Sequence, residues 1–230
     1  MNFTNLAGRV FSRGIVFASR TLYWLLSFIL VIMAFRWLPD GLEKTIPWVA
    51  YQLQDNAVAL YVHMISAAIP MAIIPFQLWG RFHRARPRLH RYLGSIAVIS
   101  TMISGMSLIP LALNIDAPAW GQAGFIIGGV LWMSAAAIAV YYVWRRDYER
   151  HRWWMMITAT LIFGAVTLRF TFPVFRDVGL FSFEVAYSLA GWSSWTFNLT
   201  GFFAWQYRRQ IRALFVRRDR VRNPSQMPGE

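Results

Sequence analysis

The chain has 230 residues, of which 57% are hydrophobic, 17% aromatic and only 14% charged. A soluble domain is about one half apolar and about one quarter charged. The apolar residues here come in blocks, so the composition indicates one membrane domain rather than soluble ones. The chain has no cysteine, which excludes disulfides, cysteine-ligated iron–sulfur centres and thiolate metal sites. A formal net charge of +13 would suggest nucleic-acid binding in a soluble protein.

Residues 1–20 carry three arginines and no acidic residue. Their apolar residues recur every three to four positions, which predicts one face of a short helix on the membrane surface. The apolar run that follows is too long for a signal peptide and has no small-residue cleavage site before the next charges. We therefore expect residues 21–38 to form the first transmembrane span, with Arg36 and Trp37 at its far interface.

Five further apolar runs have the roughly 20 residues that a helix needs to cross about 30 Å of hydrocarbon. They cover residues 57–79, 92–115, 122–144, 153–172 and 185–206. We predict an all-α bundle of six transmembrane helices within residues 21–206, with the second to fifth spans as a four-helix core. Small residues in the third to fifth spans suit close contact between helices. The segments between the spans are expected to be loops.

Basic residues are distributed very unequally between the two sides that this topology defines. One side holds nineteen lysines and arginines: three in residues 1–20, five in 80–91, four in 145–152 and seven in the tail 207–230. The other side holds four. The positive-inside rule then places both termini in the cytoplasm.

The positive charge is thereby explained by topology and by attraction to anionic lipid. Nucleic acid is therefore not expected as a partner. The last part of the tail contains Pro, Ser and Gly and is expected to be disordered.

His63 is an ionisable residue inside the second span, about 9 Å from its outer end. Arg169 lies about 5 Å inside the outer end of the fifth span, and Met106 in the third span has a depth similar to that of His63. Three further residues lie on the same face of the second span as His63, namely Ser66, Pro70 and Gln77. Such a polar stripe faces the bundle rather than lipid. We therefore expect His63, Arg169 and Met106 to share one pocket near the outer side.

Two interpretations of this outer pocket remain open. In the first, His63 is a haem or metal ligand, and Arg169 neutralises a propionate, a phosphate or a quinone oxygen. In the second, His63 forms hydrogen bonds with Ser or Thr hydroxyls, Arg169 anchors the helix to lipid headgroups, and Met106 packs against its neighbours.

The other three histidines lie at the cytoplasmic boundary. His90 begins the third span, His151 begins the fifth, and His83 lies in the basic segment between the second and third spans. Neutral imidazole ligates haem iron, zinc or copper. Histidines beside arginines at an interface are also commonly solvated or bound to lipid phosphate. The sequence therefore offers the pair His90 and His151 as ligands and leaves this alternative open.

No sequence motif identifies a reaction. The chain has no HExxH sequence, no P-loop, no GxSxG elbow and no GxGxxG turn. The spans contain no carboxylate, which argues against a proton- or cation-coupled transporter. The sequence thus leaves open whether the protein is an enzyme.

Several of the polar residues stand in short segments that together resemble a known family. These are His63 in a span ending PFQ (75–77), RPRLHRYLG (86–94), HRWWM (151–155) and AVTLR (165–169). Over about residues 57–172 the chain resembles the bacterial predicted membrane proteins called domain-of-unknown-function family 2306. The resemblance implies a multi-pass inner-membrane protein. It also supports four polar residues of the pattern together as candidate site residues, namely His63, His90, His151 and Arg169.

Two hypotheses from different classes follow. The first is a redox membrane protein that binds haem b or a metal, with His90 and His151 as inner ligands, His63 as an outer ligand and Arg169 as an anion clamp. Histidines inside four-helix bundles suit haem. Because His63 is the one histidine on the outer side, a single chain holds at most one bis-histidine haem, unless a methionine or a second subunit supplies a further ligand. The second hypothesis is a non-catalytic accessory or assembly subunit of a larger membrane complex. A small-solute permease is a third, weaker alternative.

Overall fold

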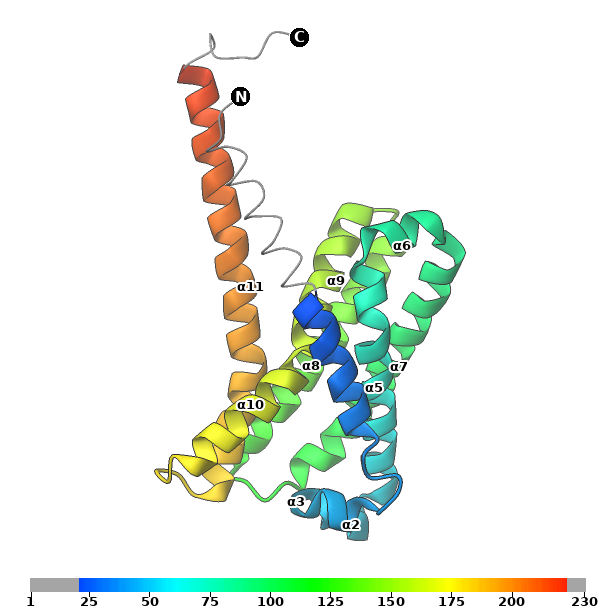
Figure 1. The fold of residues 1–230 in the computed structure, drawn as a ribbon, viewed down its shortest axis with the longest axis vertical. Helices are drawn as coiled ribbons and strands as arrows, with labels where there is room; N and C mark the ends of the chain where they lie inside the picture. The colour runs from blue at the N-terminus through cyan, green and yellow to red at the C-terminus, as the bar shows by residue number, and fades with distance from the viewer. Residues whose placement is uncertain (1–20, 223–230) are drawn as a thin grey trace.

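The computed structural model describes residues 21–222, with only the path of the helix given at 209, 210 and 212–222. The surface helix expected within residues 1–20 and the disorder expected at the end of the tail lie outside the described residues. All regular secondary structure in the described part is helical (Figure 1). This confirms the all-α class.

Four segments of the described chain are long and apolar enough to cross a membrane. They are α5 (Ala57–Leu78), α7 (Pro87–Leu113), α8 (Ala119–Trp144) and the segment Tyr148–Asp177, which comprises α9 (Tyr148–Ile162) and α10 (Gly164–Asp177). These match the second to fifth predicted spans. The first predicted span contains a shorter apolar helix, Thr21–Ala34. The sixth lies within α11 (Phe183–Arg222).

Most segments expected to be loops contain helix instead. The connection between the first two predicted spans folds into three one-turn helices, α2 (Leu42–Thr45), α3 (Pro47–Ala50) and α4 (Gln52–Asp55). The basic segment after the second span contains the short helix α6 (Gly80–Ala85). The helix α11 likewise continues from the sixth predicted span into the basic tail as far as Arg222. Hydropathy marks where a chain leaves the hydrocarbon, whereas backbone hydrogen bonding can continue into the polar interface. Sequence boundaries of spans are therefore poor boundaries of helices.

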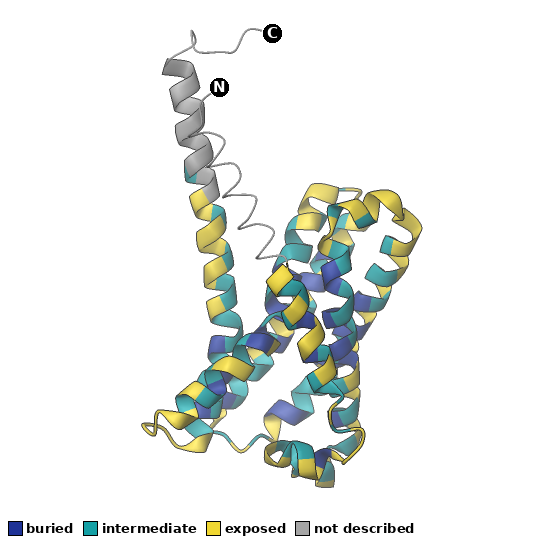
Figure 2. Cartoon of the chain, viewed as in Figure 1, coloured by how far each residue is buried: buried dark blue, intermediate teal, exposed yellow. Residues whose placement is uncertain are grey.

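The four spanning segments form a closed ring. The helix α5 packs along α7, α7 along α8, α8 along α9, and α9 contacts α5. The helix Thr21–Ala34 lies against this ring through Leu30, which joins Met71 and Ile74 of α5 and Ile162 of α9 in one buried cluster. Buried residues lie where these helices meet, while exposed residues cover both ends of the bundle (Figure 2).

Tryptophans of α11 fit onto glycines of α8. A Cβ atom on Gly124 would lie 2.8 Å from the ring of Trp192, and one on Gly128 would lie 2.7 Å from the ring of Trp195. Both indoles donate hydrogen bonds to carbonyl oxygens of α8, Trp192 to Trp120 at 2.9 Å and Trp195 to Gly124 at 3.0 Å. The small residues expected to allow close helix contact thus do so between α8 and α11.

The segment Tyr148–Asp177, which corresponds to the fifth predicted span, breaks after Ile162. The helix α10 therefore leaves the direction of α9 and packs against α11 (Figure 1). Gly164 permits this approach, because a Cβ atom there would lie 2.9 Å from the carbonyl oxygen of Ser194. One turn further, the hydroxyl of Thr167 donates to Asn198 Oδ1 at 3.0 Å. The polar residues in the middle of α11 therefore face α10.

Candidate functional site

His63 projects from α5 onto α7. Its Nδ1 lies 3.0 Å from the carbonyl oxygen of Ser104 and 3.2 Å from Ser104 Oγ. Because a carbonyl oxygen only accepts, Nδ1 carries the proton and Nε2 holds the lone pair of the neutral ring. Ser66 and Pro70, on the same face of α5, are buried. The polar stripe therefore faces the bundle as predicted, and His63 bonds α5 to α7.

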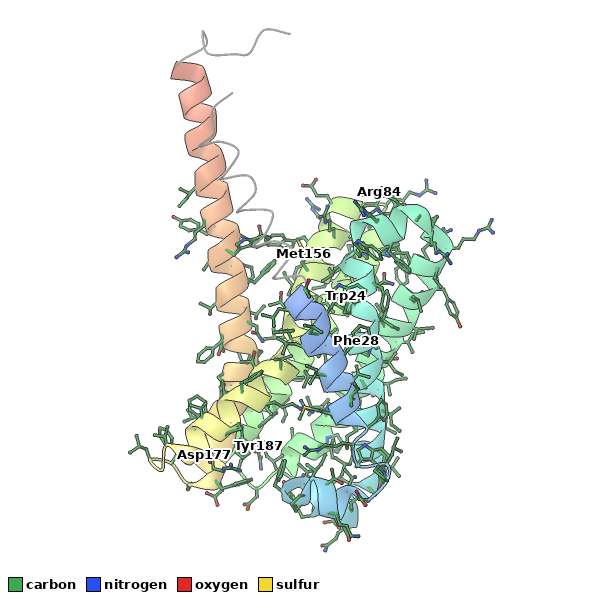
Figure 3. All side chains as sticks on the ribbon, in the orientation of Figure 1. Trp24, Phe28, Arg84, Met156, Asp177 and Tyr187 are labelled. Atoms are coloured by element: carbon green, nitrogen blue, oxygen red, sulfur yellow. The ribbon has the colours of Figure 1, made fainter. Side chains whose placement is uncertain are left out.

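Arg169 lies in α10 and is exposed. Its Nη1 donates to the carbonyl oxygen of Ala165 in its own helix at 2.9 Å. The charge of Arg169 influences His63 and Tyr187, which lies near the start of α11 (Figure 3). Within the part of the chain that the structure describes, no carboxylate forms an ion pair with Arg169. His63 bonds to α7 and Arg169 bonds within α10, so a pocket shared by the two residues stays a prediction.

Met106 does not belong to this outer group, contrary to the expectation from its depth. Its side chain is 67% exposed, whereas Ser104, which contacts His63, is completely buried. Depth along a span therefore predicted the level of Met106 but not the direction in which it points.

The three remaining histidines lie at one end of the bundle, in α6 and at the starts of α7 and α9 (Figure 1). His83 of α6 and His90 of α7 have ring centroids 5.7 Å apart. The charges of His83 and His151 both act on His90. Among the described residues, no group of three or more His, Cys, Asp or Glu side chains is arranged to hold a metal ion. A site built on these histidines would accordingly use two protein ligands.

The turn between α8 and α9 sets the position of His151. Arg146 has a φ of 57°, in the left-handed region, which allows the chain to reverse tightly after α8. Asp147 then caps α9, with Oδ1 accepting from the backbone N–H of Arg150 at 3.0 Å. One residue later, His151 Nδ1 donates to the carbonyl oxygen of Ala139 at 2.9 Å. Its Nε2 therefore keeps the lone pair, which is the form found in metal-ligating histidines held by a carbonyl.

His90 has a ring nitrogen without a partner. Its Nδ1 is buried and forms no hydrogen bond within the described residues. Its backbone carbonyl oxygen accepts from Gln77 Nε2 at 3.2 Å, and the Gln77 side chain lies over Gly94, where a Cβ atom would be 3.5 Å from Gln77 Oε1. The sequence segments ending PFQ and RPRLHRYLG therefore meet in space, and Gln77 holds the start of α7 in place.

Sequence analysis missed two other polar groups. Gln52 of α4 is buried, and its Nε2 donates to the carbonyl oxygens of Leu111 and Asn114 at 3.2 and 3.0 Å. Tyr23 and Ser27, one turn apart in the helix Thr21–Ala34, have buried hydroxyl groups without a partner. The available signal was a polar residue inside or beside an apolar run, which is too common to single these positions out.

A groove of about 370 Å³ lies between the helix Thr21–Ala34, the end of α5, α9 and α11. Tyr23, Met156, Phe163 and Phe202 are among the residues that line it. Met156 lies on the side of α9 that faces α11 (Figure 3). The groove is thus a mainly apolar space, and four of its nine lining residues are aromatic.

Comparisons with known proteins identify the family. The family model described as "Predicted membrane protein (DUF2306)" matches residues 60–205. The match includes the four spanning segments and extends past residue 172, where the resemblance was expected to end, into α11. Searches among curated proteins and among solved structures found no match. The chain therefore belongs to the DUF2306 family of predicted membrane proteins.

Proposed function

We propose that this protein crosses the inner membrane six times, with both termini in the cytoplasm, and carries electrons on one haem b held between His90 and His151. The observation that carries the proposal is the hydrogen bonding of the two imidazole rings. His90 Nδ1 is buried without a partner, and His151 is fixed through Nδ1 to Ala139 with its Nε2 free. The two histidines come from α7 and α9, which are not neighbours in the ring of helices.

The imidazole nitrogens of His90 and His151 are suitable ligands for haem b. Haem b in helical bundles takes two neutral imidazoles as axial ligands and supplies one-electron redox chemistry when bound. Haem also carries two propionates, and the segments 80–91 and 145–152 around these histidines contain five and four arginines. Arginine forms paired hydrogen bonds with carboxylates. The charge of these segments therefore suits a cofactor with anionic groups at the cytoplasmic interface.

His63 does not take part in this site. Its partner Ser104 is 14 residues from His90 along α7, which separates them by about 21 Å. A single iron therefore cannot bind both His63 and His90. In this proposal His63 holds α5 to α7, and Arg169, which lacks a carboxylate partner, remains available for an anionic group at the outer side.

The absorbance spectrum of the full chain purified in detergent tests the proposal. We expect a Soret band and about one haem per chain by the pyridine haemochromogen assay. His90→Ala and His151→Ala should each lose the band. His83→Ala should keep it, because His83 is exposed and lies beside His90 in the same cluster, which makes it the matched control.

A colourless protein from cells supplied with a haem precursor would overturn the proposal, as would a band that both substitutions leave intact. A colourless protein that copurifies with a stoichiometric partner would instead favour an accessory subunit. A second groove, of about 550 Å³ along α11 between Trp195 and Tyr207, is the surface such a partner would use.

A further inference from the structure

The groove beside α9 has flat aromatic walls. The rings of Tyr23 and Phe163 are stacked with centroids 5.2 Å apart and an angle of 17° between their planes. Phe202 and Trp205 of α11 line the opposite side, and Leu78 lies at one end. Aromatic walls of this kind favour a planar, conjugated ring, because offset stacking adds to the gain from burying apolar area.

One polar group in the groove lacks a partner. The hydroxyl of Tyr23 is buried and forms no hydrogen bond with any residue in the described part of the chain. By contrast, the Thr160 hydroxyl donates to the carbonyl oxygen of Met156 at 2.8 Å, and both ends of the Asn198 amide are bonded. A buried polar group left unpaired is costly, especially in the membrane, where water is not available. Tyr23 also lines the groove, which makes a ligand seated there the candidate acceptor for this hydroxyl.

The ligand must satisfy both features. A lipid acyl chain fills apolar space but accepts no hydrogen bond. A phospholipid headgroup accepts hydrogen bonds but does not suit an aromatic space. A quinone ring is planar, carries carbonyl oxygens as acceptors, and has an apolar isoprenoid tail that can remain in the bilayer. The volume of about 370 Å³ is within the range typical of sites for small molecules.

We propose that this groove binds the ring of a membrane quinone, with the hydroxyl of Tyr23 donating a hydrogen bond to a ring carbonyl oxygen. The ring lies against the walls formed by Phe163 and Phe202, and the tail leaves the groove toward lipid. This inference concerns binding alone and stands on the groove. It does not depend on whether His90 and His151 hold haem.

Photolabelling of the full chain in detergent tests the inference. A short-chain ubiquinone with an azido group on the ring is expected to label peptides from α9 and α11 next to the groove, and unlabelled short-chain ubiquinone should displace it. Tyr23→Phe removes only the hydroxyl, so the concentration for half displacement should rise about threefold to tenfold, the value of one neutral hydrogen bond. Thr160→Trp, which fills the groove, should abolish labelling there.

Tyr207→Phe is the matched control, because Tyr207 is 64% exposed and lines the other groove. It should leave displacement unchanged. Equal displacement in the wild type and in Tyr23→Phe, or equally strong displacement by oleate, would overturn the inference and identify an acyl-chain groove. The same labelling in His90→Ala separates the two proposals, since loss of haem should leave quinone labelling intact.

Discussion

Three polar side chains bridge to α7 along its length. Gln52 bonds its C-terminal end, His63 its middle and Gln77 its N-terminal start. Apolar helices gain no hydrophobic free energy from leaving lipid, so close packing and hydrogen bonds between helices hold a membrane bundle together. The position of α7, and of His90 on it, therefore depends on these three contacts.

Substitution of His63 tests its structural role. His63→Leu should lower the free energy of unfolding in detergent by about 0.5–2 kcal/mol, the usual value of a hydrogen bond between transmembrane helices. The haem content should stay the same. Thermal unfolding followed by circular dichroism measures the change. Met106→Leu is the control and should have little effect, because Met106 is exposed. Loss of haem in His63→Leu without loss of stability would instead make His63 a ligand.

For single residues, the sequence predicted which face of a helix is buried better than it predicted which side chains contact each other. The helical period placed His63 on the face of α5 that meets α7, while the predicted proximity of His63 to Arg169 stays a prediction. Reasoning from depth failed for Met106, because the depth of a residue in the membrane does not determine the direction in which its side chain points around the helix axis. The contact of Gln77 with His90 was not predictable, since it depends on how α6 turns the chain back between two spans.

Close steric packing holds helices together as well as hydrogen bonds do, and the contact of α8 with α11 is an example. Two indoles of α11 occupy the space left by glycines of α8. Periodic apolar runs predicted the spans, because hydropathy follows membrane depth. They did not predict the break between α9 and α10, which occurs at Gly164, whereas α5 continues through Pro70 and Pro75. The break depends on the close approach of α11, a tertiary contact.

A methyl group on α8 should disturb this contact. Gly128→Ala should destabilise the protein by about 1–3 kcal/mol, because the new Cβ atom would meet the ring of Trp195 and overpacked sites relax poorly. The midpoint of thermal unfolding in detergent is the measurement. Gly201→Ala in α11 is the matched control, since no atom lies within 4 Å of a Cβ atom there. Equal stability of the two variants would show that α8 and α11 are not in close contact.

The whole molecule has two chemically different ends. The arginine-rich helix α6 and the turn between α8 and α9 lie at one end, while α2, α3 and the connection from α10 to α11 lie at the other (Figure 1). The unequal distribution of charge seen in the sequence is thus also a separation in space. This separation supports the proposed orientation.

Single cysteines can test the six-span topology, because the natural chain has none. In intact spheroplasts, a membrane-impermeant maleimide should label Asp116→Cys and Leu180→Cys. It should not label Ala85→Cys or Arg208→Cys until the cells are permeabilised. All four residues are exposed. Labelling of Arg208→Cys from outside would remove the sixth span, and labelling of Ala85→Cys would reverse the orientation.

The length of α11 has a consequence for where the positive charge of the tail acts. The helix has 40 residues and continues 16 residues past the end of the sixth predicted span at 206, from 207 to 222. A straight helix of that length reaches about 24 Å beyond the membrane interface. At physiological ionic strength the Debye length is about 8 Å, so salt screens most of the attraction between lipid headgroups and a charge at that distance. In the proposed orientation, the basic loops therefore lie at the bilayer surface, whereas the far end of the α11 helix lies in the cytoplasm, about three Debye lengths from the headgroups.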